Sequence, residues 1–344
     1  MPVHIRPADL PREKSALVQL FRRFLSLESD DQRFDWLYLN GPHGTGQAWV
    51  ACETEGGNII GAAAAFPREL SIAGRSQRAW VLGDFCLDPK FRSLGPALAL
   101  QRTCLRESCA IPGEFCYDLP SQSMTAIYAR LGIAETGRLV RWVKLLSLTP
   151  KIRSAVRSAT IANAIGTPVE FFLRRRGGRS RDNVAQLQLH EGHCSSEFSE
   201  LNAQVCTGSG TFTSRSAEYL NWRYLDHPGG RHAIMTARRS GVLVAYAVFR
   251  REDNRLVVAD ICSIDEPQFV LLLLAGVTEQ GQQCGAEALN LVAADSHPWS
   301  ELFRRAGFHP RETSPLMTCG IERSGEFDAK QITAWHFMNG ERES

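Results

Sequence analysis

The chain has 344 residues, of which 44% are hydrophobic and 22% are charged, and its formal net charge at pH 7 is +2. This is the composition of an ordinary globular protein, and the length favours two domains over one. A net charge so close to zero gives no support for nucleic acid as the main partner.

Neither the N-terminus nor the longest apolar run predicts a membrane anchor. The first residues lack the apolar core of a signal peptide, and the longest apolar run, residues 269–277, is about half as long as a membrane span. The ten cysteines are scattered without a C-x-x-C pair, and several lie in apolar segments, where a thiol behaves as a small hydrophobic side chain. We therefore expect a cytoplasmic protein without an integral membrane segment.

In the first 148 residues, short apolar segments alternate with segments of helical periodicity. We expect strands over residues 3–6, 48–54, 59–66, 79–87, 115–119 and 139–148, and helices over residues 11–27, over residues 124–131 and after the turn at residues 88–95. Residues 55–58, Glu-Gly-Gly-Asn, are typical of a hairpin turn.

Residues 149–183 differ from the segments on either side and contain an arginine-rich stretch, residues 174–181. One interpretation is a solvated basic linker between two domains. The other is a segment that contacts a membrane surface or a polyanion. The sequence leaves both interpretations open.

A second cycle of elements follows the linker. We expect strands over residues 184–189, 233–238, 242–250, 256–264 and 288–293, and helices over residues 195–205, 219–224, 269–280 and 299–306. The order of elements is similar to that of the first half, which indicates two copies of one fold. We therefore divide the chain into residues 1–148, a linker at 149–183, and residues 184–344.

A short basic turn follows the predicted strand at residues 79–87. It contains Lys90, Arg92, Gly95 and Pro96 directly before a helical segment. The first N–H groups of a helix have no partner within the helix and attract anions. Gly95 permits a tight turn and close approach of a ligand, and proline suits the first helical position. The turn predicts a pyrophosphate site, with an ordinary strand–helix turn as the alternative.

Residues 87–97, Leu-Asp-Pro-Lys-Phe-Arg-Ser-Leu-Gly-Pro-Ala, resemble the acyl-CoA signature of the GNAT superfamily of N-acyltransferases. In that family a strand ends in an apolar-Asp-Pro step before the pattern Arg/Gln-x-x-Gly-x-Gly/Ala, and Arg92, Gly95 and Ala97 occupy the patterned positions. A second family motif is similar to residues 126–133, where Ile133 replaces an aromatic residue. The resemblance covers residues 3–148. It implies an α/β fold with a mixed sheet, present here as two tandem GNAT-like domains.

The resemblance also implies a reaction and a set of site residues. In GNAT enzymes an amine attacks the thioester of acyl-CoA directly, without a metal. Tyr128 would then protonate the leaving thiolate, and Asp84 and Asp118 are the candidate bases. The alternatives are a core aromatic for Tyr128 and a capping or turn role for each aspartate. The implied cofactor-binding residues are Phe85, Cys86, Leu87, Arg92, Ser93, Leu94, Gly95 and Ala97.

The second half resembles the family only in part. Residues 301–308 are similar to the later helix motif, but residues 265–269, Asp-Glu-Pro-Gln-Phe, stand where the phosphate-binding turn is expected. Two carboxylates there would repel a pyrophosphate. We therefore predict that the second half does not bind CoA.

The expected activity is transfer of an acyl group, most simply acetyl, from acyl-CoA to a primary amine of a small molecule or an amino sugar. Two alternatives stay open: a non-catalytic CoA-binding module, and a Fem-like transferase that takes an aminoacyl group from tRNA. The sequence does not fix the acceptor, the acyl length or the oligomeric state.

Overall fold

The structure is a computed structural model that describes residues 3–54, 57–91, 94–111, 113–147, 185–208, 210–320 and 335–342. The predicted linker at 149–183 lies outside these residues, as do Arg92 and Ser93 of the predicted phosphate-binding turn. The domain boundaries at 148 and 184 therefore stay predictions.

The N-terminal half alternates strands and helices in the predicted order, with one additional helical segment after α1. Its elements are β1 (His4–Pro7), α1 (Leu10–Phe24), α2 (Asp31–Phe34), the π-helical η1 (Asp35–Leu39), β2 (Gln47–Cys52), β3 (Ile59–Ile72), β4 (Arg75–Leu87), the 3₁₀ turn η2 (Pro89–Phe91), α3 (Leu94–Ser108), β5 (Phe115–Asp118), α4 (Gln122–Arg130) and β6 (Gly137–Leu145).

The C-terminal half repeats this order and adds the short strand β8. Its elements are β7 (Gln186–Leu189), α7 (Ser196–Val205), β8 (Thr211–Thr213), α8 (Ala217–Leu220), the π-helical η3 (Asn221–Leu225), β9 (Ala233–Arg239), β10 (Val242–Glu252), β11 (Arg255–Ser263), α9 (Pro267–Gln283), β12 (Ala288–Ala294), α10 (Ser300–Arg305), β13 (His309–Gly320) and the 3₁₀ turn η5 (Asn339–Glu341).

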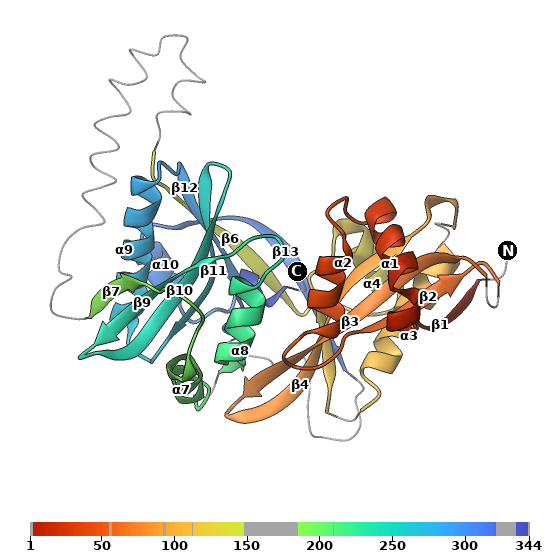
Figure 1. Cartoon of the computed structure of the whole chain (residues 1–344), viewed down its shortest axis with the longest axis horizontal. Coiled ribbons are helices and arrows are strands. Elements are labelled where there is room, and N and C mark those ends of the chain that lie inside the picture. Colours follow the sequence, from red (N-terminus) through yellow and green to blue (C-terminus); the bar gives the residue numbers. More distant parts are fainter. Residues whose placement is uncertain are drawn as a thin grey trace, which may run out of the picture.

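The strands form one mixed sheet in which the two halves exchange their last strands. The order is β1-β2-β3-β4-β5-β13-β6-β12-β11-β10-β9-β7, and β8 pairs with β3. Thus β13 of the C-terminal half lies between β5 and β6, while β6 of the N-terminal half pairs with β12. Figure 1 shows β6 among the strands of the C-terminal half. The predicted mixed α/β fold is confirmed, and the exchange joins its two halves.

Helices cover both faces of the sheet. In the N-terminal half, α3 and α4 pack against one face around Leu100, Met124 and Tyr128. The other face is covered by α1, η1 and, from the C-terminal half, α8 and η3, which share one core. A separate core beneath α9 and α10 belongs to the C-terminal half. Each half therefore has its own helix layer, and a common apolar layer lies between them.

Several regions differ from the predicted elements. β13 was not predicted, because Pro310, Pro315 and several polar residues interrupt its alternation; it forms a strand because β5 and β6 pair with it on both sides. The predicted helix at residues 219–224 is one turn of α-helix followed by the π-helical η3. The counterpart of this segment in the N-terminal half, α2 with η1, was not predicted.

Candidate active site

The parallel strands β4 and β5 separate in the middle of the N-terminal half. They pair only where Ala79–Val81 lie beside Phe115–Tyr117. Beyond Val81, none of the described residues of β5 pairs with β4. This edge of β4 therefore diverges from β5 towards its C-terminal end. A cavity of about 580 Å³ lies there, between the end of β4 and α4.

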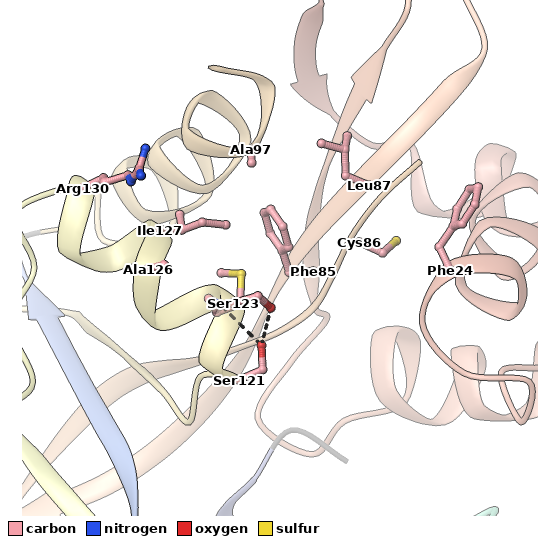
Figure 2. Close-up of a pocket in the computed structure, with 11 residues that line it drawn as sticks. Phe24, Phe85, Cys86, Leu87, Ala97, Ser121, Ser123, Ala126, Ile127 and Arg130 are labelled. Carbon is pink, nitrogen blue, oxygen red and sulfur yellow. Dashed lines mark hydrogen bonds between the residues drawn. The ribbon is translucent and has the colours of Figure 1, made fainter. Parts of the chain in front are cut away.

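Residues from β4, α4, α3 and α1 line the cavity (Figure 2). Figure 2 places Phe85 on the side of β4 that faces α4, and Cys86 on the side that faces Phe24. The lining residues are Phe24, Phe85, Cys86, Leu87, Ala97, Ser121, Ser123, Met124, Ala126, Ile127 and Arg130. Four predicted cofactor-binding residues, Phe85, Cys86, Leu87 and Ala97, are thus brought together at one cavity.

A β-bulge shapes the floor of this cavity. Ala64 pairs with Gly83 and Ala62 pairs with Cys86, so Asp84 and Phe85 lie opposite a single residue of β3. Asp84 has a φ of 47°, which is uncommon for a residue other than glycine. The extra residue reverses the alternation of side chains, so Asp84 turns towards α2 while Phe85 faces the cavity.

Buried hydrogen bonds hold the Asp84 carboxylate in place. Both guanidinium Nη atoms of Arg33 donate to it, at 2.7 and 2.9 Å, and the Tyr38 hydroxyl donates at 2.8 Å. Burial, and next the charge of Asp84, raises the pKa of Tyr38 well above its usual value. The predicted base Asp84 therefore belongs to an Arg–Asp–Tyr triad that fixes the bulge.

The other two predicted catalytic residues form a second buried cluster. The Tyr128 hydroxyl donates to Asp118 at 2.5 Å, and the Gln101 side-chain amide donates to the Tyr128 oxygen at 2.9 Å. Burial, and next the Asp118 charge, raises the pKa of Tyr128 well above its usual value. An acid role for Tyr128 would need its O–H to reach the cavity, and here its hydrogen bonds join α4 to β5 and α3.

The predicted phosphate-binding turn ends at the N-terminus of α3. Asp88 Oδ1 accepts a hydrogen bond from the Lys90 N–H at 2.9 Å, which shapes the start of the turn. Gly95 is exposed, and a Cβ atom at this position would have no described heavy atom within 4 Å. Gly95 is therefore not required by packing within the chain, and the space beside it is open. The side chain of Leu94 lies outside the described part of the structure.

The triad at Asp84 has a counterpart in the C-terminal half that our sequence analysis missed. On β11, the Asp260 carboxylate accepts hydrogen bonds from Arg215 at 2.8 Å and from the Tyr224 hydroxyl at 3.2 Å. Tyr38 and Tyr224 occupy the same position in η1 and η3. The pattern Trp-x-Tyr-Leu, at residues 36–39 and 222–225, is visible in the sequence and could have identified both triads.

The two π-helical segments also contact each other across the halves. The indole N–H of Trp36 donates to the Trp222 carbonyl at 2.8 Å, and the indole N–H of Trp222 donates to the Trp36 carbonyl at 2.9 Å. Their rings stack with centroids 4.7 Å apart. This reciprocal pair fixes the triad of one half relative to the other.

The C-terminal segment, residues 335–342, occupies the equivalent gap in the second half. β11 and β12 pair in parallel only up to Val258 and Leu291, and η5 then contacts both strands. Met338 bridges to Ala293, and Arg215 donates a hydrogen bond to the Glu341 carboxyl at 2.7 Å. In Figure 1 the C-terminus lies between the two halves. The gap that is a cavity in the N-terminal half is therefore filled by the chain itself in the C-terminal half.

This architecture, a mixed sheet with a gap between two parallel strands, is the fold of the GNAT superfamily of N-acyltransferases. Three solved structures share it across most of the chain. A probable N-acyltransferase from Enterococcus faecalis has a TM-score of 0.66 at 12% identity, covering 92% of this chain and 72% of that one. A GCN5-related N-acetyltransferase from Anabaena variabilis has a TM-score of 0.64 at 12% identity, with the same coverage.

The third solved structure is Saccharomyces cerevisiae N-myristoyltransferase with bound myristoyl-CoA. It has a TM-score of 0.54 at 11% identity, covering 98% of this chain and 90% of that one. No protein-family model matches the chain, and no curated protein shows significant sequence similarity. At these identities the comparisons establish the fold.

Two further properties bear on the class of site. Within the described ranges, no cluster of three or more His, Cys, Asp or Glu side chains could hold a metal ion. No helix among the described residues is long and apolar enough to cross a membrane.

Proposed function

We propose that this protein is an acyl-CoA-dependent N-acyltransferase whose N-terminal half binds the cosubstrate. The observation that carries the proposal is the cavity of about 580 Å³ between the end of β4 and α4, where β4 has diverged from β5. It combines the edge of β4 with an apolar lining and a helix N-terminus. Acyl-CoA matches these three features. Its arm carries amides that can pair with a strand edge, its acyl thioester suits an apolar lining, and its pyrophosphate suits a helix N-terminus.

The proposed position of CoA follows from those features. The pantetheine arm, which carries two amides, extends along β4 and hydrogen-bonds to the main chain of Phe85, Cys86 and Leu87, as an added strand would. The pyrophosphate lies at the N-terminus of α3, beside Gly95 and Ala97. Arg92, Ser93 and Leu94 complete the phosphate-binding turn as predicted from the sequence.

Arg130, which the sequence analysis did not single out, supplies an additional cation at this cavity. It follows one turn after Ile127 on α4, and both residues line the cavity. A guanidinium at this point attracts a phosphate.

In the proposed reaction, the amine nitrogen forms a bond to the thioester carbon, and the carbon–sulfur bond then breaks. The negative charge first develops on the carbonyl oxygen, and the bulge at Phe85 presents main-chain N–H groups to it. The charge then moves to the thiolate, which Ser121 and Ser123 at the N-terminus of α4 stabilise. The amine loses its proton to solvent in the cavity.

In this scheme the predicted catalytic residues have positioning roles. Asp84 holds the bulge through Arg33 and Tyr38, and the hydrogen bond between Tyr128 and Asp118 holds α4 at its distance from β5. The two clusters thereby fix the two walls of the cavity, β4 and α4, in position before the substrates bind.

The acceptor in this proposal is a primary amine of a small molecule or an amino sugar, and the acyl group is acetyl. A cytoplasmic location stays a prediction from the cysteine pattern. The C-terminal half is proposed to bind no CoA, because residues 335–342 fill its equivalent gap.

A binding experiment tests the proposal. Isothermal titration with acetyl-CoA should give one site per chain, and Arg130→Glu should weaken binding by at least tenfold. Arg102→Glu is the matched control, since Arg102 lies on α3 beside a different hollow. Equal binding by both variants would contradict the assignment of the cavity, and no binding by the unmodified protein would contradict the function.

One observation favours a second candidate, a CoA-binding protein without catalysis. The phenol of Tyr128 is buried and hydrogen-bonded to Asp118, so it is not presented to the leaving sulfur. Acetyl-CoA binding without CoA release across a panel of amines would support this candidate.

A further inference from the structure

The two halves meet at a buried cluster of polar side chains around Tyr117, which we call the seam. It consists of Arg68 on β3, Tyr117 on β5, Tyr219 on α8, Trp222 on η3, and Trp335 in the C-terminal segment, and each residue is less than a tenth exposed. The ring of Trp335 lies edge-on to Tyr117 with centroids 5.3 Å apart. The Arg68 guanidinium lies 5.4 Å from the Trp222 ring centroid. The seam thus contains residues from both halves.

The seam holds more hydrogen-bond donors than acceptors. Arg68 donates through Nη1 to the Pro67 carbonyl at 2.9 Å. Within the described part of the chain, its Nε and Nη2 atoms have no hydrogen-bond partner, and neither do the Tyr219 hydroxyl and the Trp335 indole N–H. Guanidinium and indole nitrogens only donate, so only an acceptor can pair with these atoms.

The seam also carries a positive charge that the described residues leave uncompensated. The Asp260 carboxylate forms an ion pair with Arg215 at 2.8 Å, and the Glu341 carboxyl accepts a hydrogen bond from Arg215 at 2.7 Å; neither pairs with Arg68. Burial raises the pKa of Glu341 to about 8, so at neutral pH this carboxyl adds little negative charge. An unpaired buried cation is destabilising. An anion at Arg68 would remove that cost.

We propose that the seam binds a carboxylate group, held by Arg68 and Tyr219. The free Nε and Nη2 atoms lie on one edge of the guanidinium, and that edge matches the two oxygens of a carboxylate. The Tyr219 hydroxyl supplies a third donor. A carboxylate only accepts hydrogen bonds, so it corrects both the excess of donors and the excess of charge.

This site is separate from the proposed position of the thioester. Arg68 pairs with Ala79, whereas the bulge begins at Asp84, roughly 17 Å further along β4 at about 3.3 Å per residue. The carboxylate therefore is not part of acyl-CoA. Its source is either the amine acceptor, which rests on the proposed function, or a free carboxylate metabolite.

Thermal denaturation with sodium acetate tests the site without any need for catalysis. Acetate should raise the Tm saturably, and acetamide, its neutral counterpart, should not. Arg68→Met should lose at least tenfold in acetate affinity and, in buffer free of small anions, should be as stable as the unmodified protein or more so. Arg75→Met removes one exposed arginine from the neighbouring strand and should keep the full response.

Several outcomes would overturn the proposal. One is that Arg68→Met responds to acetate as the unmodified protein does. Another is that Arg68→Met is much less stable than the unmodified protein in anion-free buffer. The third is that acetate and chloride raise the Tm of the unmodified protein equally. Tyr219→Phe is a second variant that leaves Arg68 in place: removal of one donor should weaken acetate binding severalfold, and unchanged binding would contradict the site.

A kinetic comparison then separates the two sources. If the seam binds the carboxylate of the acceptor, acetate should compete with the amine and raise its KM. If the seam binds a separate carboxylate metabolite, acetate should leave the KM for the amine unchanged. An inactive protein that still responds to acetate would refute the proposed function and keep the seam site.

Discussion

Replacement of Asp84 by asparagine separates a positioning role from a general-base role. The Asp84 side chain is 2% exposed and forms a two-point ion pair with Arg33, whose side chain is 19% exposed. Asparagine is the informative replacement because, like aspartate, it tolerates the positive φ of the bulge and keeps one acceptor oxygen. The change therefore removes the charge without adding backbone strain at the bulge.

The expected loss of stability follows from the partners of Asp84. Loss of one member of a buried ion pair costs about 3–5 kcal/mol. Because Arg33 is partly exposed and asparagine still accepts one hydrogen bond, we expect about 2 kcal/mol for Asp84→Asn. The weakened bulge should also lower acetyl-CoA affinity by about tenfold, since about 1.4 kcal/mol corresponds to that factor.

The assay combines urea denaturation with isothermal titration of acetyl-CoA, and the C-terminal half supplies a matched control. Asp260→Asn disturbs the equivalent triad at Arg215 and Tyr224, which is more deeply buried, so it should lower stability at least as much but leave acetyl-CoA affinity unchanged. A general base would behave differently: Asp84→Asn would then lose turnover by orders of magnitude with stability and affinity unaffected. That result would refute the positioning role.

Three further predictions concern the walls of the cavity and the C-terminal segment. Tyr128→Phe should lower the free energy of unfolding by about 1–3 kcal/mol in urea denaturation, because the half-buried Asp118 carboxylate loses the Tyr128 donor; unchanged stability would contradict this. Gly61→Ala should weaken acetyl-CoA binding in titration, because a Cβ atom would lie 2.8 Å from the Cys86 carbonyl oxygen and displace the end of β4; normal affinity would argue against β4 as the binding edge. The pKa of the Glu341 carboxyl is about 8 in the folded protein, compared with an ordinary value of 4.5. Between these values the folded state holds a proton that the unfolded state releases, so the free energy of unfolding should fall as the pH rises from about 5 to 8. Glu341→Gln should remove that fall in pH-dependent thermal denaturation, and a fall of the same size would contradict the assignment.

The sequence predicted the elements that carry local patterns. The strand that contains Phe85, Cys86 and Leu87 is apolar, and the turn after it has the glycine and proline of a helix start, so the location of the cavity wall could be predicted from these residues. The bulge at Asp84 could not, because it depends on the register of β3 against β4, which no local pattern determines.

Long-range pairing explains the remaining differences. β13 carries Pro310 and Pro315 and becomes a strand only because the other half provides neighbours on both sides. Residues 335–342 have no strong periodicity, and their position follows from contacts with Arg215 and Arg223 in the C-terminal half. The triads were accessible from the sequence through the repeated Trp-x-Tyr-Leu pattern, but only a comparison of the two halves would have revealed it.

A crystal structure of the protein soaked with CoA tests the central claim most directly. We predict density for the pantetheine arm between β4 and α4, with the pyrophosphate beside Gly95 at the start of α3, and none in the gap that residues 335–342 fill. An empty cavity in the N-terminal half, or CoA bound between β11 and β12 instead, would contradict the account.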